Sequence, residues 1–288
     1  MLKIAIYGSR RQAPYKEKIR ALLRRLALSD VCILMDRKLY RHLADDLGMS
    51  LPGVCEAPEV YADMDGVDMV LSIGGDGTFL RTAAWVGRTG TPVLGINTGH
   101  LGYLAPLSID DAPEYVDYII AGDYNVEPRS LIAVEGIKTH GWPYALNEVV
   151  LSKDDSASMV SAVAKIDGID LATYKADGLI IATPTGSTAY NLSAGGPIVQ
   201  PSAPVVVLTP IAAHSLGMRP LVVNGDSCLT VRVEGRGHTF RLTLDGRTTV
   251  VPMGTELSLR RADFAVNVVQ PHGAGFPNVL HDKLMFNA

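Results

Sequence analysis

The chain has 288 residues, which is enough for two domains of ordinary size. Hydrophobic residues make up 47% of it, charged residues make up 19%, and the formal net charge is −4, so the composition supports globular cores and excludes a basic nucleic-acid-binding surface. Three widely spaced cysteines argue against a disulfide framework or a zinc site. With no signal-peptide pattern at the N-terminus and no apolar run of about 20 residues, we expect a cytoplasmic protein that binds neither membrane nor nucleic acid.

Strand-like and helix-like patterns alternate over residues 1–124. Strands are expected at 3–7, 31–35, 69–73 and 92–96, and helices at 15–28, 37–47, 78–86 and 112–120. This alternation predicts an α/β domain with a Rossmann-like parallel sheet that has helices on its faces. Ligands of such sheets bind at the carboxyl ends of the strands.

Short β-rich runs dominate residues 125–272 and are separated by Gly, Pro, Asn and Asp clusters. Strands are expected at 130–135, 146–151, 161–166, 179–182, 205–208, 228–233, 240–244, 256–260 and 265–269. This pattern predicts an all-β sandwich domain. Residues 273–288 form a C-terminal tail with a helix expected at 279–286, and we expect the tail to pack back on the first domain.

A glycine-rich turn with the sequence Gly-Gly-Asp-Gly-Thr occupies residues 74–78, between an expected strand and an expected helix. Glycines let backbone N–H groups approach an anion closely, and a helix N-terminus adds partial positive charge, so phosphate is the natural ligand. A carboxylate repels phosphate, so Asp76 favours phosphoryl transfer over passive binding. The alternative is a tight turn in which Asp76 caps the helix.

Two further polar segments are candidates for ligand binding. The segment Asn-Thr-Gly-His-Leu-Gly at 97–102 is suited to a loop that folds over a ligand, or it is an ordinary loop with a hydrogen-bonded histidine. Asn147 and Glu148 lie in an expected apolar strand, where adjacent side chains point to opposite faces. Both can accept hydrogen bonds from sugar hydroxyls, although a polar pair on an edge strand remains an alternative.

The longest polar segment runs from Lys175 to Pro197. An apolar strand leads into Thr183-Pro-Thr-Gly-Ser-Thr-Ala-Tyr190, whose hydroxyls and N–H groups suit phosphate or ribose and whose tyrosine offers a ring to a base. Asp245-Gly246 is typical of a hairpin turn. No Walker-type phosphate loop is present. The segment Gly8-Ser9-Arg10-Arg11 matches the glycine-rich dinucleotide fingerprint too weakly to count as one.

In order along nearly the whole chain, these segments resemble the NAD kinase family. The turn at 74–78 is shared with diacylglycerol, sphingosine and phosphofructokinase-like kinases, whereas the 183–190 segment is much more specific to NAD kinases. The resemblance implies phosphorylation of the 2′-hydroxyl of the adenosine ribose of NAD⁺ by ATP or polyphosphate, giving NADP⁺. It also implies a divalent cation, Mg²⁺ or Mn²⁺, that is carried by ATP rather than bound by protein ligands, and a homodimer or homotetramer.

The resemblance also implies roles for individual residues. Asp76 corresponds to the proton acceptor, and the phosphate-binding residues are Gly74, Gly75, Gly77 and Thr78. The implied NAD-binding residues are Asp76, Gly77, Arg81, Asn147, Glu148, Lys175, Asp177, Thr188, Ala189, Tyr190, Asn191, Leu192, Ser193 and Arg247. Among these, Asn147 and Glu148 would hold ribose hydroxyls, and Asp177 would accept from the nicotinamide carboxamide or a nearby amine.

Two other functions remain as alternatives. One is a lipid or sugar kinase of the same superfamily, which the 185–190 segment disfavours. The other is a non-catalytic regulator that responds to NAD, which has no need of a carboxylate at 76 facing phosphates.

Overall fold

The structure, a computed structural model, describes residues 1–58, 66–99, 102–138, 141–154, 159–215, 217–273 and 275–284. The chain divides into two compact units: unit 1 is Met1–Pro128 with Val266–Ala288, and unit 2 is Arg129–Ala265. The chain leaves unit 1 within strand β7 (Asn125–Glu135) and returns to it within strand β18 (Glu256–Gln270). The boundaries between the two units, after residues 128 and 265, thus lie inside continuous strands. The expected domain boundaries were after residues 124 and 272.

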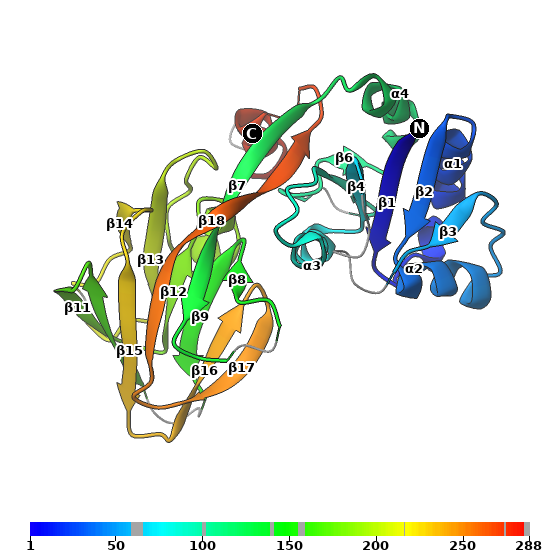
Figure 1. The fold of residues 1–288 in the computed structure, drawn as a ribbon. Coiled ribbons are helices and arrows are strands. Elements are labelled where there is room, and N and C mark those ends of the chain that lie inside the picture. Colours follow the sequence, from blue (N-terminus) through cyan, green and yellow to red (C-terminus); the bar gives the residue numbers. More distant parts are fainter. Residues whose placement is uncertain are drawn as a thin grey trace. The chain divides into compact units, whose positions relative to one another are not determined.

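Unit 1 is built on a parallel sheet with strands in the order β5, β4, β1, β2, β3 (Figure 1). Its strands are β1 (Leu2–Gly8), β2 (Val31–Met35), β3 (Val54–Glu56), β4 (Met69–Ile73), β5 (Val93–Asn97) and the short β6 (Leu107–Ser108), which pairs with β5. Every residue of β4 and β5 is buried, as expected for central strands covered on both faces. The returning end of β18 pairs in parallel with β5 through Val268 and Val93.

The helices of unit 1 are α1 (Lys16–Ala27), α2 (Arg37–Arg41), α3 (Asp76–Val86), α4 (Ala112–Ala121) and α6 (Phe276–Leu284). A 3-10 turn, Ala13–Tyr15, precedes α1. Helix α1 buries one apolar face at Ile19, Leu22, Leu23 and Leu26 against the core of the unit, which explains its amphipathic sequence. The helix expected at 37–47 is α-helical only to Arg41, and a π-helical turn continues it over His42–Asp46.

Unit 2 contains two antiparallel sheets that enclose one apolar core. One has the order β14, β13, β12, β9, β16, β17, and its strands are β9 (Glu148–Lys153), β12 (Gly178–Ala182), β13 (Val205–Ile211), β14 (Leu221–Asn224), β16 (Thr239–Leu244) and β17 (Arg247–Pro252). The other has the order β11 (Ile169–Ala176), β10 (Val160–Ile166), β15 (Leu229–Gly235), β18. In it β7 also pairs with β18, and β8 (Tyr144–Ala145) pairs with β7. A 3-10 turn (Thr185–Thr188) and the short helix α5 (Tyr190–Ser193) follow β12.

The predicted fold class, an α/β domain followed by an all-β sandwich, is confirmed. Two expected strands, 256–260 and 265–269, are one continuous strand, β18. The charged residues between them do not interrupt it, because Arg260 and Arg261 pair with Glu135 and Asp226 and all four side chains are about half exposed. Strands β3, β6, β8, β11, β14 and β17 are additional to the prediction.

The expected tail helix begins three residues earlier than predicted, at Phe276, and its last two expected positions, 285 and 286, lie outside the described residues. Within the described ranges, no helix combines the length and the apolar character needed to cross a membrane.

Candidate active site

The glycine turn of unit 1 connects β4 to α3 and needs glycine at its first position. Gly74 has a φ of 147°, and a Cβ atom there would lie 2.4 Å from the hydroxyl oxygen of Thr78. Gly75 caps α3, and a Cβ atom on Gly75 or Gly77 would meet nothing within 4 Å. The first amides of a helix have no intrahelical acceptor, so this turn presents N–H donors beside open space. That arrangement fits an anion.

The carboxylate of Asp76 is held by backbone amides. Its Oδ2 accepts from the N–H of Tyr103 at 2.8 Å, and its Oδ1 accepts from the N–H of Leu104 at 3.0 Å. A Cβ atom at Gly102 would lie 1.9 Å from Oδ1, so this approach requires glycine. Both oxygens keep a second acceptor position, so the fixed carboxylate can still bind a hydroxyl group.

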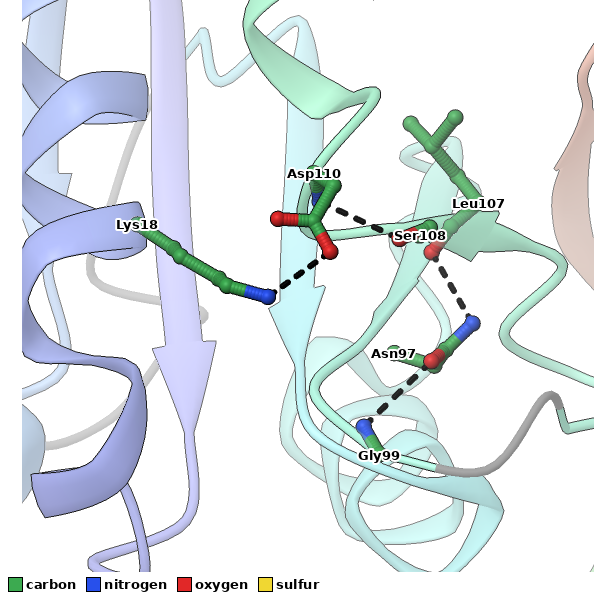
Figure 2. A network of polar contacts seen from close by, with 6 residues as sticks. All are labelled: Lys18, Asn97, Gly99, Leu107, Ser108 and Asp110. Carbon is green, nitrogen blue, oxygen red and sulfur yellow. Dashed lines mark hydrogen bonds and ion pairs between the residues drawn. The ribbon is translucent and has the colours of Figure 1, made fainter.

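The loop that supplies these amides is anchored by Asn97 at the end of β5 (Figure 2). The Asn97 amide group donates to the carbonyl oxygens of Ala105 and Leu107, at 3.2 and 3.3 Å, and its oxygen accepts from the N–H of Gly99 at 3.4 Å. One buried side chain therefore holds both ends of the loop. Residues His100 and Leu101 of this segment lie outside the described residues.

The polar contacts continue from this loop to helix α1. The N–H of Asp110 donates to the hydroxyl of Ser108 at 3.1 Å, and the carboxylate of Asp110 forms an ion pair with Lys18 at 2.7 Å (Figure 2). These contacts fix the segment that follows the loop, and the loop in turn positions Asp76.

A cleft of about 780 Å³ opens beside the glycine turn, within the size range of small-molecule sites. Gly75, Gly77, Thr78, Thr98 and Gly99 lie along it, together with the aromatic rings of Tyr7 and Tyr15. Its charged residues are Arg10, Arg11, Lys38, Arg81 and Asp36. Four cations face one carboxylate, so the cleft favours a polyanion.

Charged residues of this cleft shift the pKa of the Tyr7 hydroxyl. Burial raises its pKa, the negative charge of Asp36 raises it further, and the charge and hydrogen bond of Arg81 lower it. Arg81 also donates to the hydroxyl of Thr78 at 3.1 Å, so its guanidinium group lies at the first turn of α3. The cationic side of the cleft therefore adjoins the glycine turn.

In unit 2, the side chains of Asn147 and Glu148 present unused acceptors at the start of β9. Asn147 is 8% exposed, and no hydrogen-bond donor within the described part of the chain reaches its Oδ1 or Glu148 Oε2, although both atoms are buried. Burial, followed by the charge of Asp245, raises the pKa of Glu148 to about 7. Strand β9 begins at Glu148, so Asn147 lies directly before it. Buried acceptors without donors fit a ligand that brings its own hydroxyl groups.

Asp245 positions this pair. Its carboxylate accepts from the amides of Leu146, Asn147 and Glu148 at 2.7, 2.8 and 3.2 Å. Asp245 and Gly246 have φ values of 46° and 79° and link β16 to β17, as expected for an Asp-Gly hairpin turn. Arg247 is brought to the same place, where it donates to the carbonyl oxygen of Tyr144 at 2.6 Å.

The turn after β12 is joined to Asn147 by backbone contacts. Thr183 donates its N–H to the carbonyl of Asn147 at 2.8 Å, and a Cβ atom on Gly186 would lie 2.1 Å from that same oxygen. The backbone of Tyr190 forms a hydrogen bond with Glu148. Asn191 is fully buried and hydrogen-bonded to Ser187, Pro197 and Thr209, which makes its side chain structural. Partly or fully exposed positions of this segment are Thr188, Ala189, Tyr190, Leu192 and Ser193.

Lys175 and Asp177 lie elsewhere in unit 2. They precede β12, whereas Thr183 follows it, so the length of the strand, roughly 15 Å, separates them from Asn147 and Glu148. Asp177 forms an ion pair with Lys153 at 2.8 Å. The structure thus groups Arg247 with Asn147 and Glu148, and leaves Lys175 and Asp177 at the other end of β12.

Several site residues were missed in the sequence. The sequence marks Asp245-Gly246 as a polar segment typical of a hairpin turn, but it does not indicate the hydrogen bonds of Asp245 to the amides of residues 146–148. The contact of Gly102 with Asp76 spans 26 positions. Arg10 and Arg11 follow β1 directly, and Asp36 and Lys38 follow β2. Their position after parallel strands was the signal that could have found them. No group of three or more His, Cys, Asp or Glu side chains is placed to hold a metal ion within the ranges that the structure describes.

Comparison with known proteins assigns the family. The ATP-NAD kinase N-terminal domain matches residues 15–124, and the ATP-NAD kinase C-terminal domain matches residues 146–270. The NAD kinase of Bacteroides fragilis is 41% identical and that of Porphyromonas gingivalis is 40% identical, each over 100% of this chain and 99% of that protein.

Two solved structures share the fold. Yeast NADH kinase complexed with NADH gives a TM-score of 0.87 at 24% identity, covering 100% of this chain and 89% of that chain. An NAD kinase from Archaeoglobus fulgidus in complex with ATP gives a TM-score of 0.75 at 25% identity, covering 97% of each chain. With both family domains matched in order and full-length relatives sharing two fifths of its residues, this chain belongs to the NAD kinase family.

Proposed function

We propose that this protein phosphorylates the 2′-hydroxyl of the adenosine ribose of NAD⁺ with ATP, giving NADP⁺ and ADP. The observation that carries the proposal is the fixed carboxylate of Asp76, which two amides hold at the first turn of helix α3. The neighbouring Gly75 and Gly77 line a cationic cleft. A carboxylate beside a polyanion site has a use in transferring a phosphoryl group to a hydroxyl, because that hydroxyl must give up its proton.

Unit 1 supplies the groups for the phosphate donor. Gly74, Gly75, Gly77 and Thr78 form the phosphate-binding turn, and Arg81 extends the positive charge from it into the cleft. Arg10, Arg11 and Lys38 have no carboxylate partner within 4 Å among the described residues, so their charges are available to phosphate groups. In phosphoryl transfer, alignment of the reacting groups and neutralisation of the phosphate charges supply most of the rate enhancement.

Unit 2 supplies the groups for the dinucleotide. Asn147 and Glu148 accept hydrogen bonds from ribose hydroxyls through their unused oxygens, and Arg247 is close enough to contact the same half of the molecule. The exposed side chain of Tyr190 offers its ring to a base, with Thr188, Ala189, Leu192 and Ser193 around it. Asn191 shapes this turn from inside. Lys175 and Asp177 are proposed contacts of the distal, nicotinamide half, because an extended dinucleotide can span the length of β12.

The remaining parts of the proposal follow from family membership. The divalent cation, Mg²⁺ or Mn²⁺, arrives with ATP as part of the donor and screens the phosphate charges. Polyphosphate is a second proposed donor, since it presents the same phosphate chain to the cationic cleft. We also propose a cytoplasmic homodimer or homotetramer.

The proposal is tested by incubating the purified protein and MgATP with NAD⁺, diacylglycerol or a hexose phosphate in parallel, and then replacing ATP with polyphosphate. We expect NADP⁺ to form and the other two acceptors to stay unphosphorylated. Phosphorylation of the lipid or sugar alone would assign the chain to another kinase activity. Tight NAD⁺ binding without product at any ATP or Mg²⁺ concentration would instead assign it a regulatory role.

A further inference from the structure

The cleft of unit 1 contains one charge that a phosphate site does not explain. Of the residues described along this cleft, Asp36 alone carries a carboxylate, and it lies among Arg10, Arg11, Lys38 and Arg81. A carboxylate repels phosphate oxygens and weakens the attraction of the four cations. Its presence therefore indicates that a different part of the donor lies at this place.

Asp36 is held in position by its own backbone and by one of its two carboxylate oxygens. It follows β2 directly, its N–H donates to the carbonyl of Ile6 at 2.8 Å, and its Oδ2 caps α2 by accepting from the N–H of Leu39 at 3.1 Å. The neighbouring Arg37 pairs with Glu56 instead. No hydrogen bond to Asp36 Oδ1 is found in the part of the chain that the structure describes, so this oxygen is available to a ligand.

The chemistry of that free oxygen narrows its partner to a hydrogen-bond donor. An ionised carboxylate only accepts hydrogen bonds, and the donors of an adenine nucleotide are its ribose hydroxyls and the amino group of its base. The ribose is the nearer of the two to the phosphates, which the cations around Asp36 attract. In parallel-sheet nucleotide sites, an acidic residue following the second strand commonly binds the ribose in this way. Asp36 occupies that position, after β2 and beside the carboxyl end of β1.

Asp36 and the phosphate-binding groups also line the same cleft. The negative charge of Asp36 raises the pKa of the Tyr7 hydroxyl and the positive charge of Arg81 lowers it, so both groups lie near this hydroxyl. Arg81 also contacts Thr78 of the glycine turn. A ribose at Asp36 and a phosphate chain at Arg81 and Gly75 thus lie within one cleft.

Building on the proposed function, we propose that Asp36 binds the ribose hydroxyls of the phosphate donor and makes the protein select ribonucleoside triphosphates over deoxynucleoside triphosphates. Its free oxygen accepts from the sugar while the surrounding cations bind the phosphates. Polyphosphate has no sugar and gains nothing from Asp36.

The test compares donors on the full-length protein and on two variants. Asp36→Asn and Asp36→Ser both retain a cap for α2, because Asn and Ser are good capping residues, but they lose the carboxylate. Asp45→Asn is the matched control, since Asp45 is exposed on the same unit and does not line the cleft. NADP⁺ formation is measured with ATP, 2′-deoxyATP, 3′-deoxyATP and polyphosphate, and donor binding is measured by calorimetry without NAD⁺.

We expect the unsubstituted protein and Asp45→Asn to prefer ATP over at least one deoxy donor by about tenfold in kcat/KM, the effect of one hydrogen bond to a charged group. In Asp36→Asn and Asp36→Ser, the preference for ATP over the affected deoxy donor narrows to within about twofold. The values for that deoxy donor and for any polyphosphate turnover do not fall, because these donors lose only the repulsion between the carboxylate and their phosphates. An unchanged ATP preference in both variants would overturn the inference. If the unsubstituted protein forms no NADP⁺ with any of the donors, the proposed function is refuted instead. The ratio of the ATP and deoxyATP affinities measured by calorimetry would still decide the role of Asp36.

Discussion

At the scale of single residues, the carboxylate of Asp76 has its orientation set by hydrogen bonds from its neighbours. Amides of Tyr103 and Leu104 each hold one oxygen, and Gly102 leaves the space that the contact needs. A fixed carboxylate meets a hydroxyl in one geometry, and alignment of this kind contributes strongly to phosphoryl transfer. The catalytic role that we propose for Asp76 therefore depends on Gly102, a residue that carries no side chain.

We predict that Gly102→Ala lowers the kcat of NADP⁺ formation by about a hundredfold, because the new methyl group displaces the Asp76 carboxylate by an ångström or more. The KM for ATP should change little, since the cleft residues are untouched. Steady-state kinetics measures both values. Gly275→Ala is the control, because a Cβ there meets its nearest neighbour at 3.8 Å, an ordinary contact. Equal kcat values for the two variants would contradict the positioning role.

Glu148 gives a second prediction at this scale, since burial and the charge of Asp245 raise its pKa from 4.5 to about 7. Between these two values the folded protein holds a proton that the unfolded chain has lost, so the free energy of unfolding falls as pH rises. Above about pH 7 the full penalty for burying the charge is present. Glu148→Gln removes this ionisation.

We expect Glu148→Gln to reduce the loss of unfolding free energy between about pH 5 and pH 8 by on the order of 2 kcal/mol relative to the unsubstituted protein. Urea unfolding at the two pH values measures this difference. Glu256→Gln, on an exposed strand position, should leave it unchanged. The explanation fails if Glu148→Gln and Glu256→Gln show the same pH dependence.

At the scale of elements, Asp245 in the hairpin between β16 and β17 has two structural roles. Asp245 adopts the positive φ of the turn, and its carboxylate holds the amides that lead into β9. The turn itself was predictable from Asp-Gly. The second role was not, because the amides it holds lie nearly a hundred positions earlier in the chain.

We predict that Asp245→Gly raises the KM for NAD⁺ by at least about tenfold, because the amides before β9 lose their acceptor and Asn147 and Glu148 lose their position. Glycine accepts the positive φ, so the hairpin is kept. Asp245→Asn retains one acceptor oxygen and should have an intermediate effect. ATP affinity, measured by calorimetry, should not change in either variant. An unaltered KM for NAD⁺ in Asp245→Gly would contradict the role of Asp245 in positioning Asn147 and Glu148.

The elements that could be predicted from sequence are those with a strong apolar pattern. Strands β2 and β4 have the predicted limits, and α1 and α3 differ by only one or two residues at their ends. The missed strands are short or lie at sheet edges, where polar residues face solvent: β11 begins Ile-Asp, and β17 ends in proline. Such strands exist because a neighbouring strand pairs with them, which local sequence does not record.

At the scale of the whole molecule, the motifs of the proposed site could be recognised in the sequence, whereas the contacts that position them could not. The glycine turn, the Asn147-Glu148 pair and the 183–190 segment are local patterns. The cationic cleft gathers residues that follow four different strands, β1, β2, β4 and β5, so it exists only once the sheet has formed. The separation of Lys175 and Asp177 from Asn147 likewise follows from the direction of β12.

The oligomeric state is a prediction at this scale. The resemblance to the family implies a dimer or tetramer, and in unit 2 the edge strands β14 and β17 expose Val222 and Val250 by 47% and 56%. One chain has a mass of 30.8 kDa. We expect light scattering coupled to size-exclusion chromatography to give two or four times this mass. The mass of a single chain at micromolar concentration would contradict this expectation.

The central claim, that Asp76 acts on the hydroxyl that receives the phosphoryl group, is tested most directly by Asp76→Asn. NADP⁺ formation from NAD⁺ and MgATP is measured beside NAD⁺ binding by calorimetry, with Asp45→Asn as the control. We predict that Asp76→Asn loses about a thousandfold in turnover and binds NAD⁺ within about twofold of the unsubstituted protein, because the change removes proton acceptance and leaves the NAD-binding residues of unit 2 intact. Turnover of Asp76→Asn close to that of the unsubstituted protein would contradict the account.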